Sequence, residues 1–561
     1  MNIIKNSMGE NAQYFRVKEN YDMCVDRLLE SKKSTEKEID TGIDNDNNLK
    51  MQNNSDVMTG LKLCEMYYEE FGRKMIEEHF PEYVSKIAVG LVGEGSDCFG
   101  YDDSISRDHD WGPGFCMWVS EETFAEIGGK LQDEYEKLPK EFMGYLVKES
   151  GRGSDRRGVM SISQFCDKYT GAPDYENIDW SEVEDYSLSA AVNGKVFADP
   201  EGLFTKLREK LMLGYPDNVL YIKIAEDLAK ISQTGQYNYF RMSERGDNIT
   251  AFIMMSDCIK NVMKLLHHMN NIYPIHDKWL YKSCTQMQDE DTREILNYIE
   301  MLNDKMSECV ADMQAIQNIV DDMTSAIARK LYSIGYISDI DNYLDHHTEE
   351  LIMKSGFATH SDKELVDMIA SLEFEAFDKV KNEGGRASCQ NDWPTFSVMR
   401  KSQYLTWNRE MLMQYLYDFT REYNSGHNLI TEKYGRMMES TAPERYKELE
   451  KHFPVLSDTK KAIIEQIVGI QMKMAEEFAS KHPKIAVNAR SLHTYEDEMF
   501  DTSYETYLRG EISTYSDKML QLYGAHIVKC ASEGINVARE TIENTARLYG
   551  YNSLEEFEKD S

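Results

Sequence analysis

The sequence is poor in proline, in basic residues and in long apolar runs. Proline occurs 11 times in 561 residues, well below its usual share, so few positions interrupt a helix. Acidic residues (98) outnumber basic ones (63), and the net charge of −35 repels nucleic acid, whose phosphates need a positive surface. No run of 18 apolar residues occurs, so we expect no membrane-spanning helix.

The cysteines do not form a recognisable site. All ten are scattered, and no two have C-x-x-C spacing, which argues against a zinc ribbon or a thioredoxin-type centre. Scattered thiols are typical of reduced cytosolic proteins, and the N-terminus lacks the basic-then-apolar pattern of a signal peptide. We therefore predict a cytoplasmic protein.

What is present is enough apolar sequence for several cores. The hydrophobic share is 41%, and the length predicts two to four domains. Helical periodicity dominates from Asn218 onward. We predict an N-terminal helix and polar linker, an α/β domain, a helical domain and a C-terminal all-helical domain, at residues 1–58, 59–200, 201–360 and 361–561.

Strand-like segments are confined to the second of these regions. They are short and apolar, and helical stretches at 121–138 and 202–212 separate them, a pattern that indicates mixed α/β structure. The predicted strands are residues 87–92, 115–119, 159–162 and 195–197.

One segment combines glycine, serine and closely spaced carboxylates. Residues 93–112 read GEGSDCFGYDDSISRDHDWG. Gly95 allows the backbone to approach a phosphate, and Ser96 adds a hydroxyl beside exposed N–H groups. Asp108 and Asp110 would share one face of a strand, and such a pair binds Mg²⁺ when substrate phosphates complete its coordination.

The alternative interpretation of this segment is a solvated acidic loop or a calcium loop. Its acids are Asp102, Asp103, Asp108 and Asp110. Their order does not match the EF-hand pattern, which needs glycine at position 6 and glutamate at position 12.

Gly-Ser, eleven residues, then Asp-x-Asp after a strand resembles the nucleotidyltransferase superfamily, the fold of DNA polymerase beta and the aminoglycoside nucleotidyltransferases. The string 93–115 resembles an uncharacterised bacterial family within it, and residues 245–247 and 273–280 resemble that family's helical half. This resemblance covers about residues 60 to 350 and implies an α+β nucleotidyltransferase fold, followed by mostly α-helical domains. Residues 365–561 resemble a second uncharacterised bacterial helical domain, which implies no activity.

The resemblance implies Mg²⁺-dependent transfer of an NMP from an NTP, expected to be ATP, to an acceptor hydroxyl. The NTP would bind over Gly95 and Ser96, and Asp108 and Asp110 would be catalytic metal ligands. We predict that residues 201–350 complete the nucleotide cleft. In that arrangement the Asp108 carboxylate lies closer to Lys278 than to Glu511.

Basic residues in the same half have two interpretations. Arg107, Lys278 and the arginines at 152, 156 and 157 can bind a triphosphate, for which guanidinium groups suit. Alternatively, the arginines offset surface acids, and Lys278 is a surface lysine with a buried stem. His267 and His268 have no suitably spaced partners and are predicted to be core or helix-surface residues.

A third carboxylate, which the superfamily usually places on a neighbouring strand, is missing from residues 159–162. Asp199 is a candidate catalytic residue in its place, with a turn or N-cap before Gly202 as the alternative. The missing acid keeps open a nucleotide-binding regulator or pseudoenzyme. A further alternative is a helical module that binds a protein or a small molecule and is controlled by the first domain.

The charge of the chain also bears on the identity of the acceptor. The net charge of −35 favours a cationic small molecule or a basic protein segment over nucleic acid.

The C-terminal half carries charged and polar residues among apolar helical positions. Buried charges are costly unless they are paired or used. They form either an internal salt-bridge network or a second, substrate-binding pocket. These residues are Arg400, Gln403, Glu432, Lys433, Glu505, Arg509 and Glu511.

Overall fold

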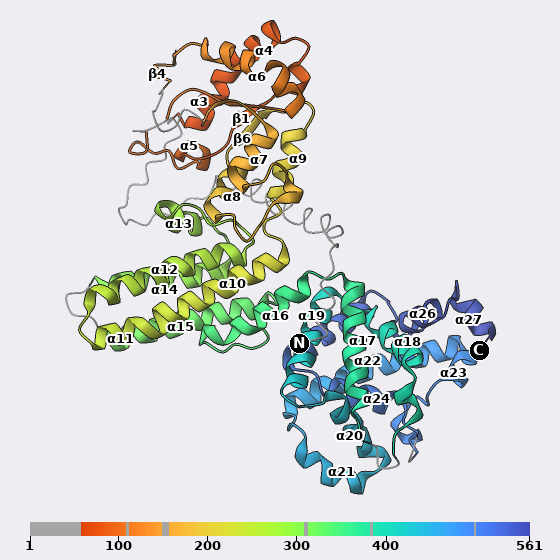
Figure 1. Ribbon diagram of the computed structural model, residues 1–561. Helices are drawn as coiled ribbons and strands as arrows, with labels where there is room; N and C mark the ends of the chain where they lie inside the picture. Colours follow the sequence, from red (N-terminus) through yellow and green to blue (C-terminus); the bar gives the residue numbers. More distant parts are fainter. Residues whose placement is uncertain are drawn as a thin grey trace, which may run out of the picture. The chain divides into compact units, whose positions relative to one another are not determined.

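The computed structural model describes residues 58–107, 111–147, 156–307, 312–381, 385–498 and 501–560. The chain divides into two compact units, Met1–Glu308 and Cys309–Ser561, shown in Figure 1. Helices dominate the described residues, and the one sheet of more than two strands found there lies in the first unit. The prediction of a helix-dominated, multidomain chain is therefore confirmed. The helix and linker predicted within residues 1–57 lie outside the described residues.

The described part of the first unit begins with a helix that packs on the sheet. The Thr59 side chain accepts from the Lys62 N–H and caps α3 (Gly60–Tyr67). The chain continues through the π-helical turn η1 (Tyr68–Gly72) into α4 (Arg73–His79). Tyr67 and Tyr68 pack edge-on or tilted against the buried ring of Phe115, which joins α3 to the core of the sheet.

The sheet has the strand order β5-β2-β1-β6. Strand β1 is antiparallel to both β2 and β6, and β2 is parallel to β5. Every residue of the two central strands is buried, as expected for short apolar runs covered on both faces. The four strands match the predicted ones within about two residues: β1 (Ala88–Leu91), β2 (Cys116–Val119), β5 (Gly158–Ser161) and β6 (Lys195–Ala198).

The strand registers place several chain segments at one edge of the sheet. Leu91, the last residue of β1, pairs with Lys195, the first of β6. Cys116, the first residue of β2, pairs with Gly90 and with Gly158 at the start of β5. We call this edge, where β1 ends and β2, β5 and β6 begin, the loop edge.

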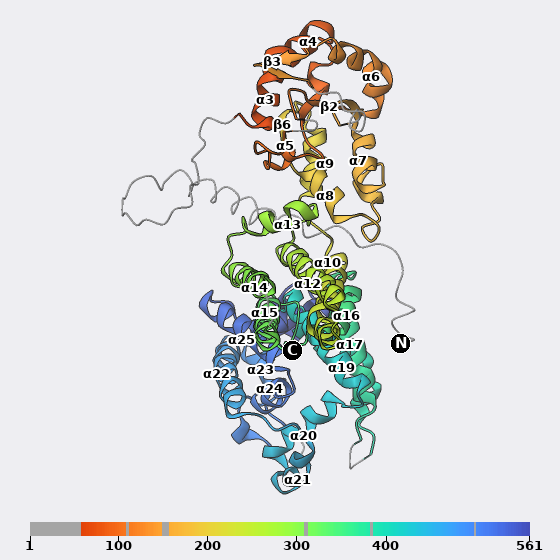
Figure 2. The same ribbon diagram turned by 90° about the vertical axis from the view of Figure 1, so that its left-hand side faces the viewer.

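Helices surround the sheet and then extend away from it. Besides the other three strands of the sheet, the elements of the first unit after β1 are α5 (Ser96–Phe99), α6 (Glu121–Glu136), β3 (Glu141–Phe142), β4 (Tyr145–Leu146), α7 (Ile162–Thr170), η3 (Tyr175–Asn177), α8 (Asp185–Val192), α9 (Leu203–Leu211), α10 (Asp217–Ile231), η4 (Ser232–Asn238), α11 (Tyr239–Glu244), α12 (Asn248–Met269), α13 (Asp277–Cys284) and α14 (Glu290–Met306). Helix α13 lies beneath α5 and α8 in both views (Figures 1 and 2).

The described elements of the second unit are all helices, with one isolated β-bridge between Glu498 and Asp501. Its longer helices are α15 (Met313–Ser333), α16 (Thr348–Ala358), α17 (Asp362–Asp378), α18 (Trp393–Tyr404), α19 (Arg409–Asn424), α20 (Leu429–Thr441), α22 (Asp458–Lys481), α24 (Tyr504–Ile512), α25 (Asp517–Ser532) and α26 (Val537–Leu548). Shorter ones are α21 (Pro443–Leu449), α23 (Pro483–Val487) and α27 (Leu554–Asp560). Ser361 and Glu364 form a capping box that starts α17. None of the helices described in either unit is long and apolar enough to cross a membrane.

Candidate functional site

The loop that follows β1 is built around glycines. Gly93 and Gly95 have φ values of 126° and 128°, a region that favours glycine. A Cβ added at Gly95 would lie 2.2 Å from Nη2 of Arg156. The absence of a side chain therefore lets the Arg156 guanidinium group lie directly over the loop. Ser96 starts α5, and its hydroxyl donates to the Ser106 carbonyl at 3.3 Å.

Asp97 holds two arginines at this loop. Its side chain is buried and forms ion pairs with Arg156 and, at 3.1 Å, with Nη2 of Arg157. Arg157 also donates to the Pro113 carbonyl at 3.1 Å. Burial lowers the pKa of Arg156, but the Asp97 and Cys98 side chains together more than offset this, so the pKa lies above its usual value. The interpretation of these two arginines as surface residues is wrong, because both side chains are largely buried.

The acids further along the loop have structural partners. Asp102 accepts from the Gly60 N–H at 2.5 Å and from Nε1 of Trp111 at 2.9 Å. Asp103 accepts from the Ser106 N–H at 2.9 Å. No group of three or more His, Cys, Asp or Glu that could hold a metal occurs within the described residues. Asp102 and Asp103 thus organise the loop itself.

Arg107 anchors the end of the loop. It donates to the Met58 carbonyl at 2.7 Å, and its guanidinium lies 4.4 Å from the centroid of the Trp111 ring. The predicted magnesium ligands Asp108 and Asp110 lie outside the described residues. Arg152 lies outside them too. The predicted comparison of the distances from Asp108 to Lys278 and to Glu511 depends on Asp108 and therefore also falls outside the described residues.

Asp199 lies at the other edge of the sheet. Ala198 pairs with Val89 near the start of β1. The Asp199 carboxylate accepts from the Gly202 N–H at 3.0 Å and from the Thr205 N–H at 2.7 Å, which is the turn and capping role given above as the alternative to catalysis. No carboxylate occurs on β5, whose sequence is GVMS.

Glu94 is a carboxylate in the loop itself. It accepts from the Tyr169 hydroxyl at 3.3 Å and from the Lys168 ammonium at 3.5 Å. Both partners lie on α7, so the carboxylate has a fixed direction although its side chain is 41% exposed.

Two residues before β6 support the loop and were not singled out from the sequence. The Asn193 side chain accepts from the Gly93 N–H at 3.0 Å and donates to the Gly93 carbonyl at 2.7 Å. The Gly194 N–H donates to the Cys98 carbonyl at 2.9 Å. A side chain at Gly194 would bring its Cβ to 2.0 Å from the Leu91 carbonyl oxygen. The Asn-Gly pair before a strand is the signal that indicates this turn.

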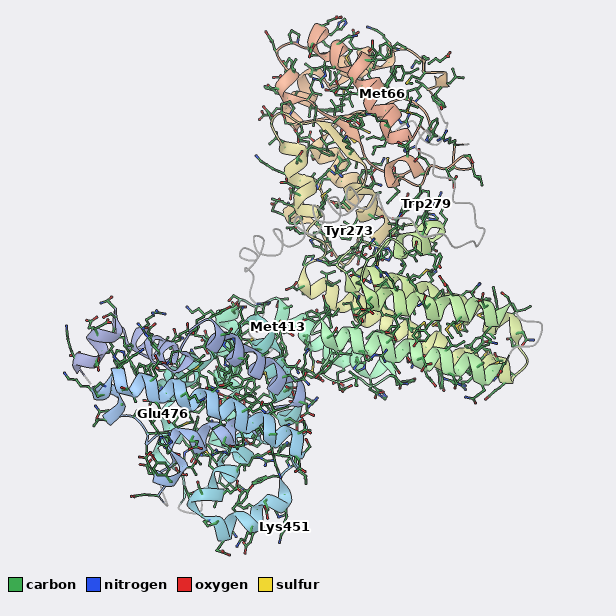
Figure 3. The ribbon with its side chains drawn as sticks, turned by 180° about the vertical axis from the view of Figure 1, so that it is seen from behind. Met66, Tyr273, Trp279, Met413, Lys451 and Glu476 are labelled. Carbon is green, nitrogen blue, oxygen red and sulfur yellow. The ribbon has the colours of Figure 1, made fainter. Side chains whose placement is uncertain are left out.

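The helical part of the first unit contacts the loop through α13. Leu280 and Tyr101 form a small core against which Phe99 and Trp279 pack. Lys278 is exposed, and its ammonium lies 4.2 Å from the centroid of the Trp279 ring. Trp279 and Tyr273 both lie where the helices meet the sheet domain (Figure 3). The structure therefore places Lys278 on a helix that packs against α5.

A second cluster of charges lies in the interior of the second unit. Arg400 donates two hydrogen bonds of 2.7 Å to Glu373 and one of 2.8 Å to Glu511. Lys433 also bonds to Glu511, and Gln403 donates to it at 2.5 Å. Four of the seven predicted pocket residues thus meet. Glu373, on α17, was not predicted.

Each charged side chain of this cluster has an oppositely charged partner within the cluster. Arg400, Lys433, Glu373 and Glu511 are each less than 5% exposed. Burial raises the pKa of Glu511, but Arg400 and Lys433 more than compensate, so it lies well below its usual range. Of the two interpretations given above, the arrangement matches the internal salt-bridge network.

The other three predicted pocket residues lie apart from Arg400. Glu432 accepts from Nε of Arg436 at 2.7 Å and contacts His427 at 2.9 Å. Arg509 bonds to Glu505 and, through two nitrogens, to Glu465. Glu432 thus pairs with an arginine on its own helix, and Arg509 pairs with Glu505 on its own helix and with Glu465 on α22.

A third buried network joins α8, α10 and α12. His267 and His268 are core residues, as predicted, but His268 has charged partners. Its Nδ1 lies 2.6 Å from Asp227, and its Nε2 lies 3.9 Å from Asp185. Asp185 also accepts from Tyr215 at 2.6 Å and from Lys223 at 3.0 Å.

The chain is also similar to known families. Two family models match. Residues 363–559 match "Protein of unknown function (DUF4125)", and residues 180–280 match "Domain of unknown function (DUF4037)". No curated protein and no solved structure matches the chain.

These two matches overlap the two regions that resemble separate families. The match in the first unit includes Asp199 and Lys278 but begins at residue 180, after the Gly93–Ser96 loop. Neither description assigns an activity.

Proposed function

We propose that the loop edge of the first unit binds a nucleoside triphosphate with Mg²⁺ and transfers its nucleotidyl group to an acceptor hydroxyl. One observation carries this proposal. The Gly95–Ser96 loop holds two guanidinium groups at the same edge where β2 begins, and the sequence Asp108-x-Asp110 precedes β2. Guanidinium forks match phosphate oxygens in shape and charge.

Each part of the loop has a role in this proposal. Gly95 leaves room for the Arg156 guanidinium over the loop, and Arg156 and Arg157 would offset the charge of phosphate oxygens bound there. Asp108 and Asp110 would hold Mg²⁺, which supplies charge stabilisation on the phosphate oxygens when bound. The acceptor oxygen forms a bond to the α-phosphorus as pyrophosphate leaves. Glu94 lies in the loop and is oriented by Tyr169 and Lys168. We therefore assign it the role of the base that accepts the proton of the acceptor hydroxyl.

The test measures pyrophosphate release by the full chain with each of the four NTPs and Mg²⁺. Asp108→Asn and Asp110→Asn should abolish it. Glu94→Gln should lower turnover by roughly 10²- to 10⁴-fold and leave nucleotide binding intact. Asp133→Asn, an exposed change on α6, is the matched control. Unchanged release in both asparagine variants would remove these residues from the mechanism.

A nucleotide-binding regulator is the second candidate. It is favoured by the lack of a carboxylate on β5 and by the capping role of Asp199 at the other edge of the sheet. Calorimetry with ATP and Mg²⁺ separates the two candidates. Tight binding without pyrophosphate release across cationic small molecules and basic peptides as acceptors would favour the regulator.

A further inference from the structure

Aromatic rings from three helices gather beside the proposed phosphate loop. Phe99 on α5, Tyr186 on α8, and His276 and Trp279 at α13 form what we call the aromatic wall. The Phe99 ring centroid lies 6.5 Å from that of Tyr186 and 5.4 Å from that of Trp279. His276 lies 5.4 Å from Tyr186 and 6.4 Å from Trp279. The four rings therefore form a continuous set of contacts.

The wall adjoins the Gly93–Ser96 loop. Phe99 ends the same short helix that Ser96 begins. The backbone positions of Ser96 and Phe99 are therefore roughly 4.5 Å apart along the helix axis. Burial raises the pKa of the Tyr186 hydroxyl, with the Glu94 carboxylate adding to the effect and Arg156 opposing it. The hydroxyl thus lies within electrostatic reach of the loop. In Figures 1 and 2, α13 lies below α5 and α8.

The wall is only partly covered by protein. Phe99, Tyr186 and Trp279 are half-buried and His276 is exposed, whereas Leu280 and Tyr101 behind them are buried. The Lys278 ammonium lies over the Trp279 ring, which places a positive charge on one face of that ring. An aromatic surface next to a phosphate site can stack against the flat ring of a nucleotide base. Stacking of this kind needs no hydrogen bonds that distinguish one base from another.

We propose that the aromatic wall stacks the base of the nucleoside triphosphate whose phosphates bind at the loop edge, and that it favours purines. This inference rests on the proposed function. Stacking strength sets the preference where no hydrogen bonds read the base, so adenine and guanine, with two fused rings, bind more tightly than uracil or cytosine. Lys278 then borders the nucleotide.

The experiment compares ligands with and without a base. The full chain is titrated by calorimetry with the Mg²⁺ complexes of ATP, GTP, UTP and tripolyphosphate. Trp279→Leu should weaken ATP binding by roughly 5- to 150-fold and leave tripolyphosphate binding unchanged. Trp393→Leu, a half-buried tryptophan that packs on Phe374 in the second unit, is the matched control and should change neither.

A second variant guards against loss of folding. His276 caps α13 by accepting from the Lys278 N–H. His276→Asn replaces the capping ring nitrogen with an amide oxygen that can accept the same bond but removes the ring, so it should also weaken ATP binding selectively. Tripolyphosphate binding as tightly as ATP, or ATP affinity unchanged in both variants, would overturn the inference and leave the proposed function standing. If neither ATP nor tripolyphosphate binds, the proposed function fails and the inference with it.

Discussion

At the scale of single residues, Gly95 is the position on which the loop geometry depends. The Arg156 guanidinium lies where a side chain at residue 95 would lie, and the Asp97 carboxylate would be 2.7 Å from the added Cβ. A methyl group there must displace a buried ion pair. The φ of 128° adds backbone strain that L-residues rarely tolerate.

Gly95→Ala should therefore displace Arg156 and weaken the binding of Mg²⁺-tripolyphosphate. The control is Gly100→Ala, because Gly100 also has a positive φ (72°) but has nothing within 4 Å of an added Cβ. Only Gly95→Ala combines strain with collision. Calorimetric titration and the thermal unfolding midpoint of both variants measure the difference. Equal effects of the two changes on binding would show that the position of Arg156 does not matter.

At the scale of secondary-structure elements, the sequence predicts features that depend on neighbouring residues, such as the positions of strands. All four strands were predictable because short apolar runs stand between glycines and polar residues. The pairing of Asp97 with Arg156 was not, because it links residues 59 positions apart and depends on β5 pairing parallel to β2. Periodicity carries no information on such pairing.

The same reason explains the partial prediction of the charge cluster in the second unit. Arg400 and Glu511 stood out as charges among apolar residues. The further pairing of Arg400 with Glu373 depends on α17 packing against α18. The carboxylates Asp108 and Asp110 remain a sequence-based prediction.

The network among α8, α10 and α12 leads to a prediction about pH. Burial lowers the pKa of His268, but Asp227 and Asp185 outweigh it and raise the pKa to about 9. Lys223 and Lys264 face the same carboxylate, Asp185. A raised pKa in the folded state stabilises the fold below the unfolded-state pKa, about 6.5. This contribution is lost as the pH rises through 9.

His268→Gln should therefore cost most stability near pH 6, and the difference from the wild type should shrink toward pH 10. Thermal unfolding midpoints of both proteins across this range give the comparison, and titration of all other groups cancels in the difference. A difference that stays constant with pH would mean that His268 is neutral in the fold.

At the scale of the whole molecule, charge limits the possible partners. The net charge of −35 opposes the approach of nucleic acid and concentrates cations around the protein. The two arginines at the Gly95 loop are thus a local exception within an acidic chain. Positive charge at the loop favours a small anionic ligand there, and negative charge on the rest of the chain favours a cationic acceptor in the proposed transfer.

The division into two units predicts two separate unfolding transitions. Each unit has its own buried residues, and separate family models match parts of each. A change confined to the interior of one unit should then leave the other unaffected. Arg400 is suited to this test because its removal leaves Glu373 and Glu511 buried with too little positive charge. Breaking a buried ion pair in this way costs about 3–5 kcal/mol.

Arg400→Met should lower the urea midpoint of residues 312–560 and leave that of residues 58–307 unchanged. Hydrogen exchange with mass spectrometry during urea unfolding assigns each transition to its peptides. Arg539→Met is the matched control, because Arg539 pairs with Glu543 on the exposed surface of α26, where such a pair contributes at most about 1 kcal/mol. If Arg400→Met lowered both midpoints together, the chain would unfold as one cooperative body, because a cost confined to the second core would then be shared by the first.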